Sequence, residues 1–303
     1  MSRRLRFLPY EKTLVEVTTR TLQGRHLLKP SRKLREITLG VLGRAQRLYD
    51  VEVHAFVFLS NHYHLLASFR DVQQMSQFCA YLNSNLAREI GRITGWREKI
   101  WGRRYADIVV SDETVSELSR LRYILSQGVK ERLVKHPLDW PGASSVAALL
   151  GPTRLKGRWY NRTKEFAARV RREQFHPRKF SEVEEVVLSP LPCWRGLSGS
   201  ERYQAVEALI ESILEETRQD EAIQPISERL RQQRATERPA RMKRSPMPWF
   251  HCASRRARRE LREAYNLFLV AYRQASEQWR RGQLTAPFPD GCFLPPGPFA
   301  TGS

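Results

Sequence analysis

Residues 51–69 read VEVHAFVFLSNHYHLLASF, two runs of apolar, β-branched and aromatic residues separated by Ser60 and Asn61. Two such runs joined by a short polar link are typical of a β-hairpin, so they predict neighbouring antiparallel strands. Successive side chains of a strand point to opposite faces of its sheet. His62 and His64 should therefore share one face, while Tyr63 should point to the other.

The sequence on either side of this hairpin alternates between strand and helix patterns. The expected elements are a strand at 13–20, helices at 32–48 and 72–90, a strand at 105–110, and a helix at 113–127 capped by Ser111 and Asp112. The resulting order, β-α-β-β-α-β-α, predicts an α+β fold of the ferredoxin-like or RRM-like sandwich type. Such a fold has an antiparallel sheet with helices on one face.

The chain is predicted to divide near residue 150, where Gly, Pro and Arg become frequent. Residues 1–150 would form the sandwich, and residues 151–303 a basic, mostly helical extension. The best helices there are predicted at 200–218 and 254–281. Between them, residues 231–248 have the charged, Pro-containing composition of a linker, and residues 285–303 that of an irregular tail.

Charge and hydropathy limit the partners of the protein. The chain has 52 Lys+Arg against 32 Asp+Glu, a net charge of +20, which favours a polyanion such as nucleic acid. No run of 18 apolar residues occurs, so no membrane partner is expected. The four cysteines lie far apart with no zinc spacing, which fits a reducing compartment. We expect a cytoplasmic, nucleoid-associated protein.

The histidine pair could share one metal ion, because imidazoles two residues apart on a strand lie on one face. The helix predicted at 113–127 carries Tyr123 and Gln127 one turn apart, hence also on one face. Tyr123 is a candidate nucleophile, and the Gln127 carbonyl oxygen could be a third metal ligand. Three other readings stay open from these residues alone: structural histidines, a core tyrosine and a solvated glutamine.

Four segments in sequence order carry a family resemblance: SNHYHLLASF, GRRYADIVV, LRYILSQGVKERLV and DWPGASS, all within residues 10–147. They resemble the HUH single-tyrosine transposases, and look closest to the REP-associated tyrosine transposases of bacteria. The resemblance implies that His62, His64 and Gln127 bind Mg²⁺ or Mn²⁺. It also implies that Tyr123 attacks single-stranded or hairpin DNA to form a 5′-phosphotyrosine.

Two positions depart from the family pattern. Ser60 stands where proline is usual before Asn61, which is a detail of the loop. The segment SQGVKERL replaces the common x-N-P-V-x-x-G-L after the tyrosine, and this change touches the third metal ligand. Glutamine offers the same carbonyl oxygen as asparagine with one more methylene of reach.

Several basic side chains are candidates for DNA contact. They are Arg3, Arg4 and Arg6 in an N-terminal arm, Arg103 and Arg104 before the strand at 105–110, and Arg255, Arg256, Arg258 and Arg259 beside Trp249 and His251. An ordinary solvated charge remains the alternative for each. His176 and His251 lie outside the resemblance and receive no catalytic role.

Three functions compete. The leading hypothesis is a transposase-like DNA endonuclease and strand transferase that cleaves and rejoins single-stranded DNA. A replication-initiator or relaxase-like nickase would use the same histidines and tyrosine. A domesticated, catalytically silent protein that binds hairpin nucleic acid would need none of them. The sequence leaves both a monomer and a homodimer open.

Overall fold

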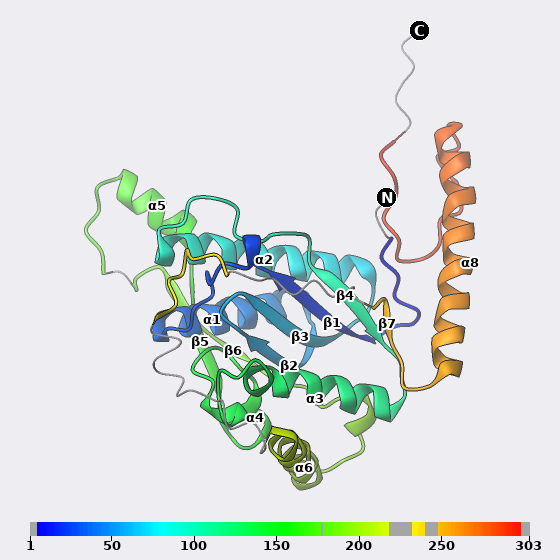
Figure 1. Cartoon of the computed structure of the whole chain (residues 1–303). Coiled ribbons are helices and arrows are strands. Elements are labelled where there is room, and N and C mark those ends of the chain that lie inside the picture. Colours follow the sequence, from blue (N-terminus) through cyan, green and yellow to red (C-terminus); the bar gives the residue numbers. More distant parts are fainter. Residues whose placement is uncertain (1–4, 177, 218–231, 240–247, 298–303) are drawn as a thin grey trace.

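The computed structural model describes residues 5–176, 178–217, 232–239 and 248–297. Its centre is a five-stranded sheet in the order β2-β3-β1-β4-β7 (Figure 1). The strands are β1 (Thr13–Arg20), β2 (Glu52–Phe58), β3 (His62–Phe69), β4 (Ala106–Val110) and β7 (Phe250–His251). All neighbours are antiparallel except β4 and β7. The predicted α+β class is confirmed, and the sheet is mostly antiparallel, with one parallel pair added by β7.

Helices cover both faces of this sheet, so the expectation of helices on one face only is wrong. α1 (Arg32–Tyr49) and α2 (Val72–Thr94) pack on one face against a core that includes Tyr63, Leu65 and Phe69. α3 (Thr114–Lys130) lies on the other face, and α6 (Gly199–Thr217) packs outside α3 (Figure 1). Strand alternation therefore sends every second side chain of β3 towards α3.

The cap predicted for α3 at Ser111 and Asp112 is wrong, because the N-cap residue is Glu113. Its carboxylate instead accepts hydrogen bonds from the Ser111 hydroxyl at 2.7 Å and the Ser254 backbone at 3.1 Å. These bonds, led by that of Ser111, lower the pKa of Glu113 to about 2. Glu113 thus joins the start of α3 to the segment that follows β7.

A second, two-stranded sheet follows residue 150, where mainly helix was expected. β5 (Leu155–Tyr160) and β6 (Ser181–Val186) pair antiparallel and pack on α1. The approach is close: a Cβ on Gly157 would lie 2.1 Å from the Gly40 backbone nitrogen. Glycine at both positions therefore permits this packing. The division of the chain at residue 150 stays a prediction.

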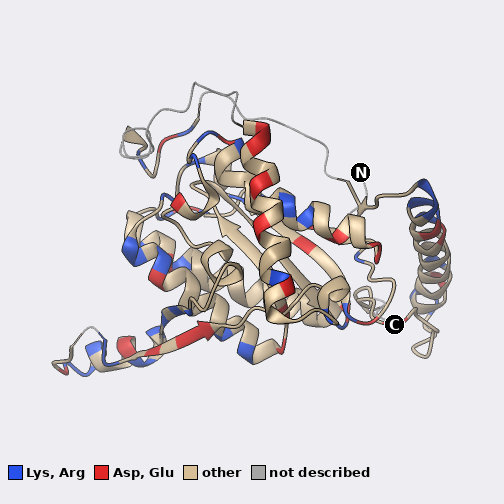
Figure 2. Cartoon of the chain, turned by 90° about the horizontal axis from the view of Figure 1, so that it is seen from below, with Lys and Arg blue, Asp and Glu red and all other residues tan. Residues whose placement is uncertain are grey.

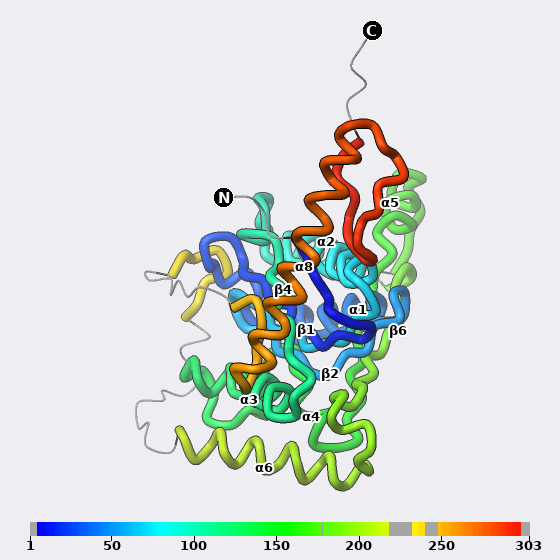
Figure 3. The backbone as a smooth tube through the Cα atoms, turned by 90° about the vertical axis from the view of Figure 1, so that its right-hand side faces the viewer, coloured from blue at the N-terminus to red at the C-terminus, as the bar shows by residue number. Residues whose placement is uncertain are grey.

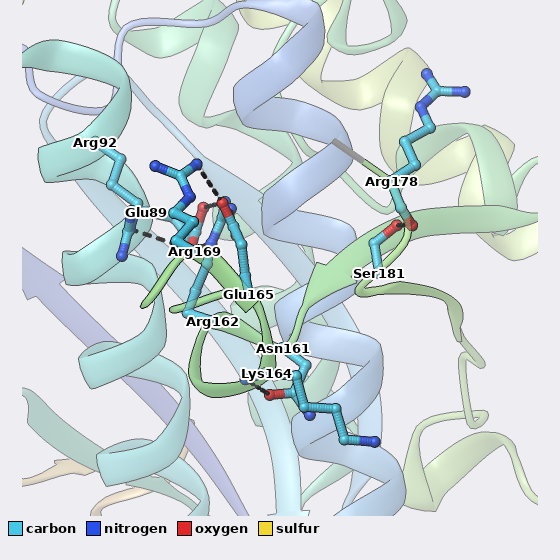
Figure 4. A network of polar contacts seen from close by, with 9 residues as sticks. All are labelled: Glu89, Arg92, Asn161, Arg162, Lys164, Glu165, Arg169, Arg178 and Ser181. Atoms are coloured by element: carbon cyan, nitrogen blue, oxygen red, sulfur yellow. Dashed lines mark hydrogen bonds and ion pairs between the residues drawn. The ribbon is translucent and has the colours of Figure 1, made fainter. Parts of the chain in front are cut away.

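Between β5 and β6 a short helix, α5 (Arg162–Val170), is tied back to α2 through paired charges (Figure 4). Arg162 donates to Glu89 of α2 at 2.6 Å and also to Glu165, which accepts from Arg169 at 2.6 Å. Asn161 caps the helix by accepting from the Lys164 backbone. Because Glu89 and Glu165 neutralise Arg162 and Arg169, these two arginines add little free positive charge to the surface.

The C-terminal region returns to the main sheet. β7 pairs parallel with β4 and leads into α8 (Arg255–Arg280), which stands at this edge of the sheet (Figure 3). The tail runs back along α8, where the Tyr272 hydroxyl donates to the Phe293 carbonyl at 3.1 Å. It is irregular as expected, although residues 298–303 lie outside the described part. Half of the predicted linker, residues 231 and 240–247, also lies outside it.

Four further elements occur in the described residues: α4 (Val146–Leu149) and three short 3-10 turns at Leu22–Gly24, Pro137–Asp139 and Pro192–Trp194. In the described residues, no helix combines the length and apolar character needed to cross a membrane.

His54 should make folding stability depend on pH. Burial lowers its pKa to about 4 from 6.5, while its ring bonds Ser68 and the Ser189 carbonyl. A depressed folded pKa means that the stabilisation is complete above pH 6.5 and is lost as pH falls towards 4. We expect wild type to lose about 3 kcal/mol of unfolding free energy relative to His54→Gln across this window.

The measurement is denaturant unfolding at a series of pH values. His176→Gln, at an exposed position, serves as the control and should keep the wild-type pH profile. A wild-type profile for His54→Gln would contradict the assignment.

Candidate active site

The two histidines of β3 lie on the face that α3 covers. Their ring centroids are 5.0 Å apart, and both side chains are buried. Tyr63 points into the opposite core, where its hydroxyl donates to Asn83 at 3.0 Å. The strand period alone therefore brings the two imidazoles together.

Glu16 of β1 fixes the orientation of His64. Thr18 is the direct partner of His64 in the β1–β3 register, so Glu16 lies diagonally across from it. The Glu16 carboxylate accepts a hydrogen bond from His64 Nδ1 at 2.5 Å. Because Nδ1 carries the proton, Nε2 is left as the nitrogen that could bind a metal.

Glu16 is also paired with a cation from α3. Its second oxygen lies 2.9 Å from Arg120 Nη1, and both side chains are buried. Burial raises the pKa of Glu16, but the hydrogen bond from His64 and the charges of His64 and Arg120 outweigh it and hold the pKa below its usual value. The carboxylate is therefore ionised at neutral pH.

We predict that Glu16→Gln lowers the free energy of unfolding by about 3–5 kcal/mol at neutral pH, because it leaves the buried Arg120 charge without a counter-ion. Denaturant unfolding measures the loss. Glu98→Gln makes the same chemical change at an exposed position and should stay within about 0.5 kcal/mol of wild type. Equal stability of the two variants would contradict the buried ion pair.

His62 is held by its own neighbour in the chain. Asn61 donates from Nδ2 to the Gly24 carbonyl at 3.1 Å, which turns its Oδ1 towards His62 Nδ1 at 2.6 Å. Nδ1 therefore donates, and Nε2 again remains. Burial, followed by the charges of His64 and Arg20, lowers the pKa of His62 well below its usual value. The ring is neutral, the form in which histidine binds metals.

Tyr123 lies next to this pair. Its ring stands edge-on to His64 with centroids 5.4 Å apart, and it is half-buried against the core under α3. Burial and the Glu16 charge raise the pKa of Tyr123, against the lowering effects of Arg120 and a hydrogen bond from Gln127. The Arg120 guanidinium and Lys130 ammonium lie 5.0 Å and 4.9 Å from the ring centroid. Of these two cations, Arg120 favours negative charge on the phenol oxygen, while Lys130 lies over the ring.

Gln127 is buried rather than solvated. Its Nε2 donates to the Tyr123 backbone carbonyl at 2.9 Å. Among the described residues, no hydrogen bond joins Gln127 to either histidine. Its role as third metal ligand therefore stays a prediction.

The donor set fits a divalent ion in part. The two imidazoles lie side by side, each with Nδ1 engaged, and His64 is backed by a carboxylate as metal-binding histidines commonly are. Within the described residues, no group of three or more His, Cys, Asp and Glu side chains is arranged to hold a metal. An amide, or a group supplied by substrate or water, could add a further ligand.

The structure adds one histidine that the sequence did not point to. His251 of β7 pairs with Val110 of β4, and its Nε2 lies 2.7 Å from the Ser119 hydroxyl of α3. Burial and the Arg120 charge lower the pKa of His251 to about 4, while Glu16 opposes this shift. His251 is thus close enough to Arg120 and Glu16 for their charges to shift its pKa. Only the pairing of distant strands could reveal it.

The candidate DNA-contact arginines have different surroundings. Arg6 is 7% exposed, with Nη1 2.8 Å from the Ser76 hydroxyl and its guanidinium 3.7 Å from the Tyr105 ring centroid. It packs inside the protein, so its assignment to a free basic arm is corrected. Arg103 and Arg104 are exposed. Arg3 and Arg4 lie outside the described residues.

The four arginines at the start of α8 are all exposed, but they differ in pairing. Arg256 pairs with Glu260 at 2.8 Å, and Arg259 approaches Glu263 at 3.8 Å. Within the described part of the chain, neither Arg255 nor Arg258 forms an ion pair. Those two arginines keep more of their charge for a ligand.

Positive charge is not spread evenly over the C-terminal region. The ribbon of α6 is coloured red at several positions along its length in Figure 2, where the helix carries exposed acidic residues. They are Glu201, Glu207, Glu211, Glu215 and Glu216. Since α6 carries a single basic residue, Arg202, its outer face repels a polyanion.

Comparison with known proteins agrees with the resemblance read from the sequence. Residues 20–127 match the family described as "Transposase IS200 like", a span that holds both histidines, Tyr123 and Gln127. No curated protein matches the chain.

Two of the similar solved structures are described as transposases. One is the REP-associated tyrosine transposase bound to a REP hairpin, 19% identical, with 49% of this chain and 85% of that chain covered and a TM-score of 0.39. The other is a putative transposase from Deinococcus radiodurans R1, 17% identical, with 42% and 98% covered and a TM-score of 0.29. Because both TM-scores are low, the family match is the stronger finding.

Proposed function

We propose that this chain, whose residues 20–127 carry an IS200-like transposase sequence, cuts and rejoins single-stranded or hairpin DNA with Tyr123 as the nucleophile. The family match supports a transposase-like, DNA-processing function. One observation carries the finer proposal: the Tyr123 ring lies 5.4 Å from that of His64, inside the matched segment. Because the two rings are in contact within one chain, we take Tyr123 to act at the histidines of its own chain.

The chain's own residues supply most of the chemistry. Tyr123 needs help, because a phenol is mostly protonated at neutral pH and is then a weak nucleophile. The Arg120 charge, which lowers the pKa of Tyr123, would stabilise the phenolate as its proton leaves. Glu16 holds His64, and Asn61 holds His62, so that both Nε2 atoms are fixed. A Mg²⁺ or Mn²⁺ ion held by His62, His64 and Gln127 would act as a Lewis acid on the scissile phosphate.

The reaction needs no external energy source, because the covalent link to Tyr123 conserves the energy of the broken phosphodiester bond. The phenol oxygen of Tyr123 attacks the phosphorus, and the bond from phosphorus to the 3′ oxygen breaks. The 3′ oxygen takes up a proton and leaves as a free 3′-OH, while the 5′ phosphate stays on the tyrosine. Attack by another 3′-OH reverses these steps and joins a new strand. Unpaired DNA is the expected substrate, because the scissile phosphate and flanking bases must be accessible.

The test is to incubate the full chain with hairpin oligonucleotides that carry single-stranded flanks, labelled at either end, in Mg²⁺ or Mn²⁺. The proposal expects a denaturant-resistant protein–DNA product that retains the label 3′ of the cut, together with a released fragment ending in 3′-OH. A relaxase-like nickase would give the same adduct without strand joining. Binding without any adduct, across metals and sequences, would favour the silent hairpin-binding protein.

A further inference from the structure

A groove lies between β7 and the first half of α8, outside the segment that matches the transposase family. Its volume is about 670 Å³, and it is lined by Pro248, Trp249, Phe250, Arg258, Arg262, Tyr265 and Asn266. Aromatic rings and guanidinium groups thus meet in one concave surface. Proteins that hold single-stranded nucleic acid use the same combination, with rings stacking on bases and cations following the phosphates.

The aromatic side chains of the groove are held in place by packing against their neighbours. The Trp249 side chain is 48% exposed, and its ring stands edge-on to Tyr265 with centroids 5.2 Å apart. Tyr265 itself is buried, packs on Phe7 and donates from its hydroxyl to the Leu5 carbonyl at 3.4 Å. Because Tyr265 fixes one edge of the indole, Trp249 is a pre-ordered platform. A planar base could stack on it with little loss of side-chain entropy.

The charged part of the groove is formed by α8. Arg258 and Arg262 are one helical turn apart, so they lie on one face together with Asn266, one turn further on. Both arginines are exposed, and within the described residues neither forms an ion pair. By contrast, Arg256 and Arg259 do not line the groove and face Glu260 and Glu263. The two arginines that line the groove therefore keep their charge available for a ligand.

The groove is connected to the candidate active site. Phe250 and His251 of β7 pair with Val109 and Val110 of β4, and His251 bonds Ser119 on α3, the helix that carries Tyr123. The strand–helix unit that forms the groove is thus fixed relative to the nucleophile. A DNA strand held there would also be positioned relative to Tyr123.

We propose that this groove binds one unpaired nucleotide of the DNA strand that flanks the hairpin. The base stacks on Trp249, Arg258 and Arg262 bind the phosphate, and the Asn266 amide bonds the base edge. The inference rests on the proposed function only in taking single-stranded DNA as the substrate. It does not require that Tyr123 react.

The experiment measures binding of the full chain to fluorescent hairpins by anisotropy, in EDTA so that no cleavage occurs. One hairpin is blunt, and the other carries a single-stranded flank. We expect Trp249→Ala to weaken binding of the flanked hairpin roughly ten-fold. Binding of the blunt hairpin should not change, which shows that the variant is folded. Trp249→Phe should retain most of the affinity.

The arginines provide the second measurement. Arg258→Gln/Arg262→Gln should weaken flanked-hairpin binding and reduce the slope of log K against log salt by about two. The matched control, Arg256→Gln/Arg259→Gln, removes two arginines of the same helix that lie outside the groove. It should change the affinity for the flanked hairpin and the salt slope by less than the groove variant does. Millimolar deoxynucleoside monophosphate should compete poorly. Competition equal to that of the strand would instead assign a free-nucleotide site and overturn the proposal.

Other results separate this inference from the proposed function. Unchanged binding of Trp249→Ala to the flanked hairpin overturns the groove alone, while adduct formation by wild type still supports the nicking enzyme. A flank-specific loss in Trp249→Ala, without any wild-type adduct in Mg²⁺ or Mn²⁺, supports the groove and overturns the nicking enzyme. If the wild type binds neither hairpin, the groove proposal and the nicking enzyme are both overturned.

Discussion

Tyr123→Phe is expected to abolish the covalent protein–DNA product and to lower the cleavage rate by at least about 10³-fold. The affinity for DNA should stay within about two-fold of that of the wild type. The change removes a single oxygen atom, the one that would attack phosphorus. The ring packing against His64 and the core under α3 remains, so the fold should be unaffected. Denaturing gels of labelled oligonucleotide measure the adduct, and anisotropy measures binding.

The control for this variant is Tyr203→Phe. It removes a phenolic oxygen from α6, where the hydroxyl donates to Glu207 at the surface. Its adduct yield should equal that of wild type. An adduct of normal yield in Tyr123→Phe would remove Tyr123 from the mechanism, and peptide mapping of the adduct would then identify the residue attached to DNA.

Loss of the metal, or of the histidines that would hold it, is expected to reduce the cleavage rate about as much as Tyr123→Phe does. EDTA should stop cleavage by the wild type, and added Mg²⁺ or Mn²⁺ should restore it. The double variant His62→Gln/His64→Gln should be at least about 10³-fold slower and should not recover with either metal, because both imidazole ligands are gone. Glutamine is chosen because it is polar and of similar size, which limits damage to the buried site.

Calorimetric titration with Mn²⁺ adds a readout that does not depend on cleavage. The wild type should bind one ion, and the double variant should bind none. Glu16→Gln should weaken Mn²⁺ binding by about 10–100-fold, since it removes the acceptor that orients His64. Thermal melting checks that each variant is folded. Cleavage by wild type in EDTA, or equal Mn²⁺ binding by the double variant, would show that the histidines serve only the structure.

Local patterns in the sequence determined the secondary structure of the first half of the chain. The alternation in residues 51–69 predicted β2 and β3 to within a residue or two, and it placed His62 and His64 on one face. The turn spacing of Tyr123 and Gln127 placed them together on α3. These predictions succeed because strand and helix periods depend on neighbouring residues only.

The tertiary structure decided what surrounds those residues. Glu16 reaches His64 because β1 pairs with β3 in one particular register, and a shift by one residue would turn Glu16 to the other face. Arg120 meets Glu16 because α3 crosses that face, and His251 arrives from about half the chain away by pairing with β4. The burial of Arg6 and the close packing of Gly40 on Gly157 depend on the same kind of distant contact.

The sequence by itself therefore determined the α+β order, the shared face of the histidines and the positive charge of the chain. Only the tertiary structure decided that His64 is held by a carboxylate, that Tyr123 lies against it, and that Trp249 and two arginines of α8 form one groove. The physical reason is that periodicity is fixed by bonds along the chain. Strand register and helix docking are instead set by which buried groups, far apart in sequence, satisfy one another.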